Sequence, residues 1–352
     1  MSTTTILDRP TSPTTARRRL EGPLLVATDG TPQSLGAFAA AVCIAAGGTR
    51  RADRTPKLQV RVVTVCDALP LLPPDVAAVV PLDFVKIQRA EKFASAIAQV
   101  RYNVADLSNW NVNVISGPPA PTIARAADES RASLVILGLG RHDLLDRVFG
   151  SETALRVIRS SHVPVLAVPQ NWIGIPRRVL IAVDFGPASI RAARTAMRIM
   201  PPGANVCFAH VAPAIGLPDY DVTLADIYQQ SLSDEFDRFI DAVGVPEDIT
   251  VERKALYGET AHALLEFAKA DGVDMIVSGT HGVNAIARLM VGSVATRLIR
   301  GAHCAVLVAS AESRQEIPDC VFSNSAKQSG RALQSASPTN VRLIDSSTNP
   351  NQ

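Results

Sequence analysis

The chain has 352 residues, which is enough for two domains with separate cores, because typical domains contain roughly 100–150 residues. Hydrophobic residues make up 47% of it and charged residues 19%, a balance that excludes a disordered chain. The net charge of +2 is close to neutral and gives no argument for nucleic acid or an anionic membrane as a partner, so we expect neither. The sequence contains no run of 18 uncharged apolar residues, which argues against a membrane span.

The N-terminal residues 1–21 contain threonines, prolines and the basic run Arg17 to Arg19, without the apolar core of a signal peptide. We expect them to form a disordered leader. Five cysteines are scattered along the chain without a CxxC pair, and four of them lie in apolar runs. This pattern is typical of buried thiols in a reducing compartment and predicts a cytoplasmic protein.

The first half, residues 22–170, alternates apolar runs with helical patterns. A strand beginning at Leu24 and ending before Asp29 is followed by an Ala-rich helix. Four further strands are predicted, with a variable helical region at Leu69 to Leu107 and an amphipathic helix at 121–130 between them; these strands lie at 60–66, 111–117, 133–138 and 163–168.

The second half, residues 177–310, repeats this plan after a short linker near Pro169 to Arg178. Its predicted strands lie at 179–184, 206–212, 251–258, 274–279 and 304–309. Over about 50 residues the halves align without gaps at a constant separation of 141 residues, as in the pairs Gly117 and Gly258, Gly138 and Gly279, and His162 and His303. The chain is therefore one unit written twice.

Strands that are apolar along their whole length and alternate with helices predict a parallel sheet covered on both faces. The fold class we predict is α/β, with two tandem doubly wound domains, each a five-stranded parallel sheet flanked by helices. Residues 311–352 are rich in Ser, Asn and Gln, lack apolar periodicity and are expected to be a disordered tail.

A glycine-rich loop follows the fourth strand of the second half. Gly279 and Gly282 are followed, after nine residues, by Gly292 and Ser293, which open a helical run. Glycines let backbone N–H groups approach a phosphate, and a helix N-terminus attracts an anion, although the same spacing can serve an ordinary turn. The chain contains no GxxxxGK[ST] motif, and Asp143 stands where a GxGxxG dinucleotide motif would need its last glycine.

With this loop, the strand-end aspartate and the tandem repeat, the second half resembles the ATP-binding type of universal stress protein (UspA) domain. That family's G-x2-G-x9-G-[ST] signature is met by Gly279, Gly282, Gly292 and Ser293. The resemblance implies that Val183, Asp184 and Val211 lie near the adenine and ribose, with Asp184 accepting hydrogen bonds from ribose hydroxyls. It also implies that the cofactor is ATP, whose phosphates could carry Mg²⁺. Thr280 and His281 lie inside the glycine-rich loop and could contact the phosphates, although we expect His281 to face solvent.

Several of these residues have a second interpretation. Asp184 could cap the following helix, and Ser293 could cap its helix instead of binding phosphate. Gly279 could be needed only for chain geometry, because the first half keeps a glycine at the same place. Arg288 and Arg297 could serve the phosphates, but solvent-exposed helix faces are the usual place for arginine.

The first half departs from the signature. Asp29, Val65 and Gly138 match their counterparts, but the separation of 141 residues puts Arg141, Ser151 and Glu152 opposite Gly282, Gly292 and Ser293. Alternatively, a one-residue slip on each side of the loop would let Gly140, Gly150 and Ser151 supply the motif. A Glu152 carboxylate beside a phosphate would weaken binding. We therefore expect the second half to bind nucleotide more tightly.

The function expected from the resemblance is a nucleotide-responsive stress or regulatory module without a dedicated catalytic activity. A weak nucleotide hydrolase and an interaction scaffold without nucleotide are the alternatives. The resemblance also implies that the fifth strands lie at sheet edges through which family members dimerise. The two halves could then pair with each other inside one chain, and a homodimer remains open. The variable segments Leu69 to Leu107 and Leu217 to Val243 are where partner specificity is expected.

Overall fold

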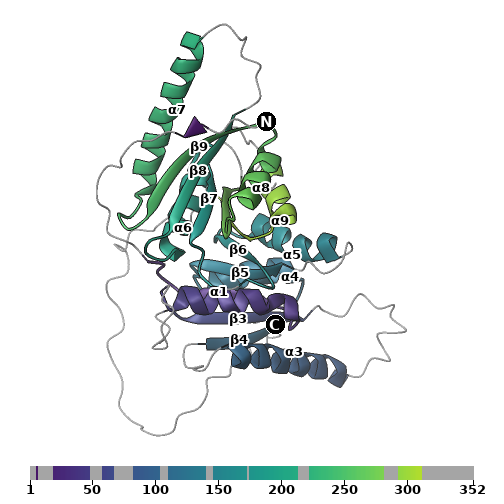
Figure 1. Cartoon of the computed structure of the whole chain (residues 1–352). Helices are drawn as coiled ribbons and strands as arrows, with labels where there is room; N and C mark the ends of the chain where they lie inside the picture. The colour runs from purple at the N-terminus through teal and green to yellow at the C-terminus, as the bar shows by residue number, and fades with distance from the viewer. Residues whose placement is uncertain are drawn as a thin grey trace, which may run out of the picture.

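The computed structural model describes residues 5–6, 19–47, 58–66, 82–103, 110–139, 146–172, 174–212, 222–280 and 292–310 (Figure 1). The first domain contributes five strands: β2 (Leu24–Thr28), β3 (Val60–Cys66), β4 (Trp110–Ser116), β5 (Leu134–Leu139) and β6 (Val165–Pro169). Its helices are η1 (Pro32–Ser34), α1 (Leu35–Ala45), α3 (Leu82–Asn103), α4 (Pro119–Glu129) and α5 (Asp146–Ser160).

The second domain repeats the same elements. Its strands are β7 (Arg178–Ala182), β8 (Asn205–Ala212), β9 (Thr250–Tyr257), β10 (Met275–Gly279) and β11 (Ala305–Ala309). Its helices are α6 (Pro187–Ile199), α7 (Val222–Val243), α8 (Thr260–Ala270) and α9 (Ser293–Gly301). The alternating strand and helix pattern predicted from the sequence is confirmed in both halves.

All of these strands, together with the short strand β1 (Thr5–Ile6), belong to one sheet with the order β1-β9-β8-β7-β10-β11-β6-β5-β2-β3-β4. Within each domain the first strand is central, with the second and third on one side and the fourth and fifth on the other, and all pairs are parallel. The order therefore reverses between the first and fourth strands. β-branched residues and leucine fill these strands, which suits a sheet buried on both faces.

The two domains are joined by their fifth strands, which pair antiparallel with Leu307 of β11 opposite Leu166 of β6. We call this junction the seam. Helices α5 and α9 lie side by side across it, and Arg300 Nη2 lies 3.5 Å from Glu152 Oε2. On the other face, Arg191 of α6 donates to the His162 carbonyl of the first domain at 2.9 Å. In Figure 1, α7 and β9 lie at one end of the molecule and α3 and β4 at the other.

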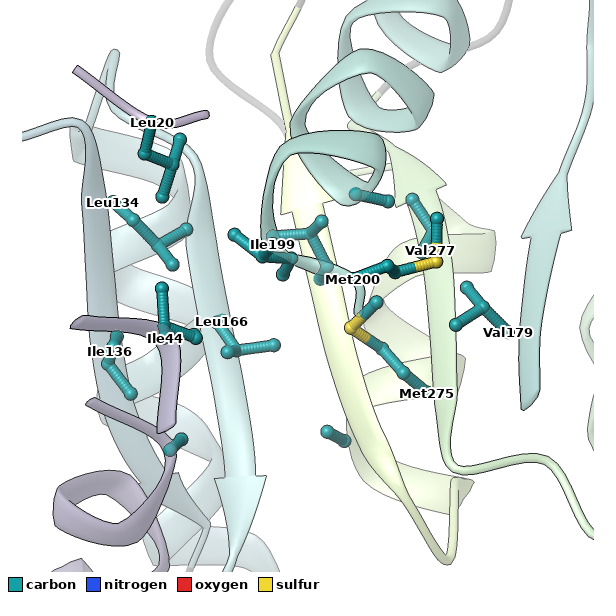
Figure 2. Close-up of a cluster of buried hydrophobic side chains, with 14 of the residues drawn as sticks. Leu20, Ile44, Leu134, Ile136, Leu166, Val179, Ile199, Met200, Met275 and Val277 are labelled. Carbon is teal, nitrogen blue, oxygen red and sulfur yellow. The ribbon is translucent and has the colours of Figure 1, made fainter. Parts of the chain in front are cut away.

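Two apolar layers sandwich the sheet. One lies between the sheet and helices α1, α3, α6 and α7, and the other between the sheet and helices α4, α5, α8 and α9. Each layer contains residues of both domains; Figure 2 shows part of the first, with Leu166 and Ile44 on one side of the seam and Met200 and Met275 on the other. The length allows two domains with separate cores, but the two domains share both layers, because strand pairing at the seam makes the sheet continuous.

The leader also differs from the prediction. Thr5 and Ile6 form β1, which pairs antiparallel with β9 at the edge of the second domain, and Leu20 is buried. An unpaired edge strand offers free N–H and C=O groups, so pairing with β1 satisfies part of the β9 edge. A wholly disordered leader at residues 1–21 is thus wrong at these positions. Residues 311–352, predicted to be a disordered tail, lie outside the described residues.

Candidate functional site at the carboxyl ends of beta7 and beta10

The site lies where the strand order of the second domain reverses. β7 and β10 are neighbouring parallel strands, so their carboxyl ends meet at the same edge of the sheet. Val183 and Asp184 follow β7, while Gly279 ends β10 and Thr280 follows it. Open α/β sheets bind ligands at this kind of switch point. The structure thus brings Val183, Asp184, Gly279 and Thr280 to one edge, as the sequence predicts.

Asp184 organises its loop with one carboxylate oxygen. Its Oδ1 accepts hydrogen bonds from the Gly186 backbone N–H at 2.9 Å and the Ser189 hydroxyl at 2.6 Å. The N-cap of α6 is Gly186, so Asp184 closes the turn before the helix and is not its N-cap residue. Among the described residues, Oδ2 has no hydrogen-bond partner. An ionised carboxylate is acceptor-only, so this oxygen suits a hydroxyl donor.

The residue after Asp184 is a feature that the sequence reasoning missed. Phe185 has a φ of 60°, in the left-handed region that bulky side chains rarely adopt. Its ring lies 4.9 Å from the His210 ring and 5.4 Å from the Phe236 ring of α7, measured between centroids. In the first domain Gly30 occupies this place, also with a positive φ. The exchange of glycine for phenylalanine between the repeats was the signal that could have revealed it.

His210 connects the neighbouring strand to the same loop. Its Nδ1 lies 2.8 Å from the carbonyl oxygen of Val183, whose N–H in turn donates to the Ala209 carbonyl at 2.8 Å. Val211, the next residue of β8, is half-buried and packs against the layer under α8. The predicted base-binding residues Val183 and Val211 therefore lie on adjacent strands, with their side chains in opposite apolar layers.

Gly279 is required by packing. A Cβ at this position would lie 2.8 Å from the Ala188 Cβ and 3.0 Å from the Ser189 backbone nitrogen, at the start of α6. Gly138 is under the same constraint, because a Cβ there would lie 3.0 Å from the Ser34 Cα. Neither glycine has a positive φ. The presence of glycine at both positions is thus explained by the close approach of the fourth strand to the start of the first helical segment in each domain.

The N-terminus of α9 is held beside the end of β10. The Gly292 N–H donates to the Thr280 carbonyl at 2.6 Å, and the Thr280 N–H donates to the Ala309 carbonyl at 2.9 Å. Gly292 is the N-cap residue and has no side chain to cap the helix, while Ser293 is the exposed first residue of α9. The interpretation of Ser293 as the cap is therefore wrong. Gly282, together with His281 and Arg288, lies outside the described residues.

Arg297 of α9 forms an ion pair with the residue that caps α8. Its Nη1 lies 2.6 Å from Oε1 of Glu259, the residue that caps α8 by accepting from the N–H groups of Ala261 and His262. The hydrogen bond from His262 N–H is the largest cause that lowers the pKa of the Glu259 carboxyl, and the Arg297 charge lowers it further. This pair links the two helices of the second domain on the α8 and α9 face.

The first domain repeats the aspartate geometry with a different surrounding. Asp29 Oδ1 accepts from the Thr31 N–H at 2.9 Å and the Ser34 hydroxyl at 3.0 Å, matching the bonds of Asp184. Three side chains of α3 then bind the carbonyls of three successive loop residues. These donors are Lys92 Nζ to Asp29 O at 2.9 Å, Ser95 Oγ to Gly30 O at 3.0 Å, and Gln99 Nε2 to Thr31 O at 2.6 Å. Sequence reasoning missed this clamp, because α3 lies in the variable segment Leu69 to Leu107, which differs between the two halves and offers no repeat pattern to compare.

The phosphate side of the first domain differs. Helix α5 begins at Asp146, so Gly150 and Ser151 lie inside the helix and do not open it, which contradicts the one-residue slip. Oε1 of Glu152 lies 3.3 Å from Nε of Arg156, and its Oε2 lies 3.5 Å from Nη2 of Arg300 across the seam. Val65 lies near the end of β3, and Gly140, like Arg141, is outside the described residues.

In the described ranges, no three His, Cys, Asp or Glu side chains gather as metal ligands would. Four cysteines, Cys43, Cys66, Cys207 and Cys304, are buried, as predicted, and burial raises the pKa of the Cys207 thiol to about 12. No helix in the described part of the chain is long and apolar enough to cross a membrane.

Comparison with known proteins agrees with this architecture. The model of the universal stress protein family matches twice, at residues 22–169 and 176–310. A universal stress protein of Methanocaldococcus jannaschii is 28% identical over 149 residues, covering 40% of this chain and 86% of that protein. A solved universal stress protein of Archaeoglobus fulgidus covers 82% of this chain and 98% of its own with a TM-score of 0.55 and 17% identity. Another, solved in complex with cAMP, covers 43% of this chain and 98% of its own with a TM-score of 0.29 and 22% identity. The chain belongs to the universal stress protein family, as two tandem domains of α/β fold.

Proposed function

We propose that the second domain binds an adenine nucleotide, ATP, and that the chain acts as a nucleotide-responsive regulatory module. The observation that carries this proposal is the arrangement at the edge of β7 and β10. There Oδ2 of Asp184, which has no partner in the described part of the chain, follows β7, and the start of α9 at Gly292 is hydrogen-bonded to Thr280 after β10. The first pairs with a ribose hydroxyl and the second with a phosphate.

Each end of the nucleotide has its own set of residues. The backbone of Val183 and of Val211, at the ends of two adjacent strands, would contact the base, while Asp184 would hold the ribose. The phosphates would lie against the loop of Gly279, Thr280, Gly282 and Gly292. There the exposed Ser293 hydroxyl and the N–H groups of the first turn of α9, after Gly292, would hold them, since the first N–H groups of a helix lack internal partners. ATP in this proposal could carry Mg²⁺ on its phosphates.

The first domain would bind nucleotide weakly. Asp29 keeps the geometry of Asp184, but the motif residues Gly150 and Ser151 lie within α5, where their N–H groups belong to the helix. Glu152 adds a negative charge close by in the chain. The asymmetry between domains is therefore part of the proposal.

Pairing of β6 with β11 supports a further part of the proposal. A sheet that runs through two fifth strands would make one chain the equivalent of a dimer of single-domain proteins. In such a chain the apolar fifth strands satisfy each other, which leaves the pairs β1 with β9 and β3 with β4 at the two ends of the sheet. Any homodimer would form through other surfaces.

Calorimetric titration with ATP of the Gly292→Asp and Gly150→Asp variants tests both the site and the asymmetry. Aspartate is a good N-cap residue, so Gly292→Asp keeps the fold while placing a carboxylate at the phosphates. At about 4 Å and an effective dielectric of about 20 this costs about 4 kcal/mol, or several hundredfold in Kd. Gly150→Asp should change Kd little. Equal losses would contradict the domain preference, and an unmodified protein that binds no ATP would overturn the proposal itself.

Mass spectrometry of nucleotide that copurifies with the protein gives an independent measurement. Close to one nucleotide per chain is expected from one tight and one weak site. Incubation with ATP then separates the regulatory module from the hydrolase, because a hydrolase would release phosphate at a steady rate whereas a binding module would retain ATP.

A further inference from the structure

A cavity of about 240 Å³ lies between the two domains, on the face of the sheet covered by α1 and α6. Leu20, Ile44 and Leu58 of the first domain line it, together with Ile199 and Met200 at the end of α6. Figure 2 shows Ile199 and Met200 facing Ile44 and Leu166 across the seam. We call it the seam cavity.

Two arginines border the seam cavity, one from each domain. Arg19 precedes β2 and packs on Gly47, where a Cβ would collide with its Nη1, and Arg198 lies in the last turn of α6. Among the described residues neither guanidinium forms an ion pair with a carboxylate. The C-termini of α1 and α6 carry roughly half a negative charge each, which is less than the two full positive charges. The cavity therefore has an apolar interior and a net positive rim.

Arg198 also lies close to a third arginine, which belongs to α6 as well. Arg191, two turns earlier on α6, has a lowered pKa because of burial and then because of the positive charge of Arg198. An anion between Arg198 and Arg19 would relieve this repulsion. A lone inorganic anion would leave the apolar walls in contact with water, so the site is matched by an anion that carries an apolar chain.

We propose that the seam cavity binds a medium-chain fatty carboxylate, with its chain against the apolar walls and its carboxylate between Arg19 and Arg198. Guanidinium groups bind carboxylates well, and two of them hold the head group from both sides. One water occupies roughly 30 Å³ in the liquid, and a chain carbon with its hydrogens is of similar size, so a cavity of about 240 Å³ holds a chain of about eight carbons. This volume lies below the roughly 300–1,000 Å³ of typical drug-sized ligand sites, so a nucleotide is a poor match.

The seam cavity is separate from the nucleotide site of the proposed function, and the inference does not rest on it. The start of α6 contacts Gly279, while the end of α6 lines the cavity. Thirteen helical residues at about 1.5 Å each put roughly 18 Å between the two places. Residues of both domains would contact the ligand, so its binding should stabilise the arrangement of the domains.

Calorimetric titration of the full chain with octanoate tests the proposal, with octanol and acetate as matched ligands that lack the charge or the chain. Octanoate should bind more tightly than octanol, and acetate should not bind. From butanoate to octanoate, Kd should fall up to about fourfold for each added methylene. No binding of octanoate at millimolar concentration, or equal binding of octanoate and octanol, would overturn the proposal.

Variants locate the ligand. Arg19→Gln and Arg198→Gln should each weaken octanoate about tenfold and leave octanol unchanged, and Arg198→Lys should retain part of the affinity. Leu58→Phe should fill the cavity and weaken both ligands. Arg125→Gln, on the exposed surface of α4 on the opposite face, is the control and should change neither. Unchanged octanoate affinity in both arginine variants, with melting temperatures showing that they are folded, would contradict the proposed head-group site.

Discussion

The rings of Phe185 and His210 lie 4.9 Å apart, and this contact fixes the loop that carries Asp184. Phe185 also makes edge contacts with Phe236 and Phe239 of α7, which compensate for its left-handed backbone. The loop of the second domain is therefore held by aromatic packing, whereas the loop of the first domain is held by the polar side chains of α3.

The Phe185→Ala variant should be less stable than Phe185→Gly, and both should be less stable than the unmodified protein. Alanine loses the ring packing and keeps the left-handed φ, whereas glycine adopts that φ without strain, so the two variants should differ by about 1 kcal/mol. Denaturant unfolding of the three proteins measures the order. An alanine variant as stable as the glycine variant would show that the backbone strain is absent.

Gly279→Ala should destabilise the protein by about 1–3 kcal/mol, because its Cβ would overlap the start of α6. Gly203→Ala is the control, since a Cβ there meets nothing within 4 Å and only the φ of +70° is unfavourable. We expect a cost of about 1 kcal/mol for the control. Thermal unfolding compares them, and equal losses would contradict the packing role of Gly279.

Asp237→Ala should cost more stability than Arg253→Met. Arg253 is only 5% exposed on β9, and its Nη2 lies 2.6 Å from Asp237 Oδ1. Removing the carboxylate leaves a buried positive charge, at a cost of about 1–3 kcal/mol after allowance for the half-exposed aspartate, while methionine fills the space without a charge. Urea denaturation gives both values, and the reverse order would show that the pair itself stabilises the fold.

The stabilising effect of Glu259 should depend on pH. Its carboxyl pKa is lowered from 4.5 in the folded protein, so its contribution is complete above this value and is lost as the pH falls through the lower folded pKa. The melting temperature of Glu259→Gln should therefore lie below that of the unmodified protein at neutral pH, and the difference should shrink below pH 4.5. A constant difference across this range would contradict the role of the charge.

The repeat made most of the fold predictable. Apolar runs that end at Asp29 and Asp184 identify first strands, and the matched spacing of Gly138 and Gly279 identifies fourth strands, because both depend on short-range chemistry. The shared apolar layers and the pairing of β1 with β9 depend on contacts between distant segments, so local patterns do not reveal them. In the site, Asp184 and Gly279 were predictable from their positions, whereas Phe185 depends on rings contributed by α7.

Antiparallel pairing at the seam also fixes the direction in which each half of the molecule faces. The parallel strands of the first domain run opposite to those of the second, so the carboxyl ends of β2 and β5 lie on one edge of the sheet and those of β7 and β10 on the other. Asp29 and Asp184 therefore lie at opposite edges of the sheet. The two repeats thus present their switch points in opposite directions, although they share one sheet.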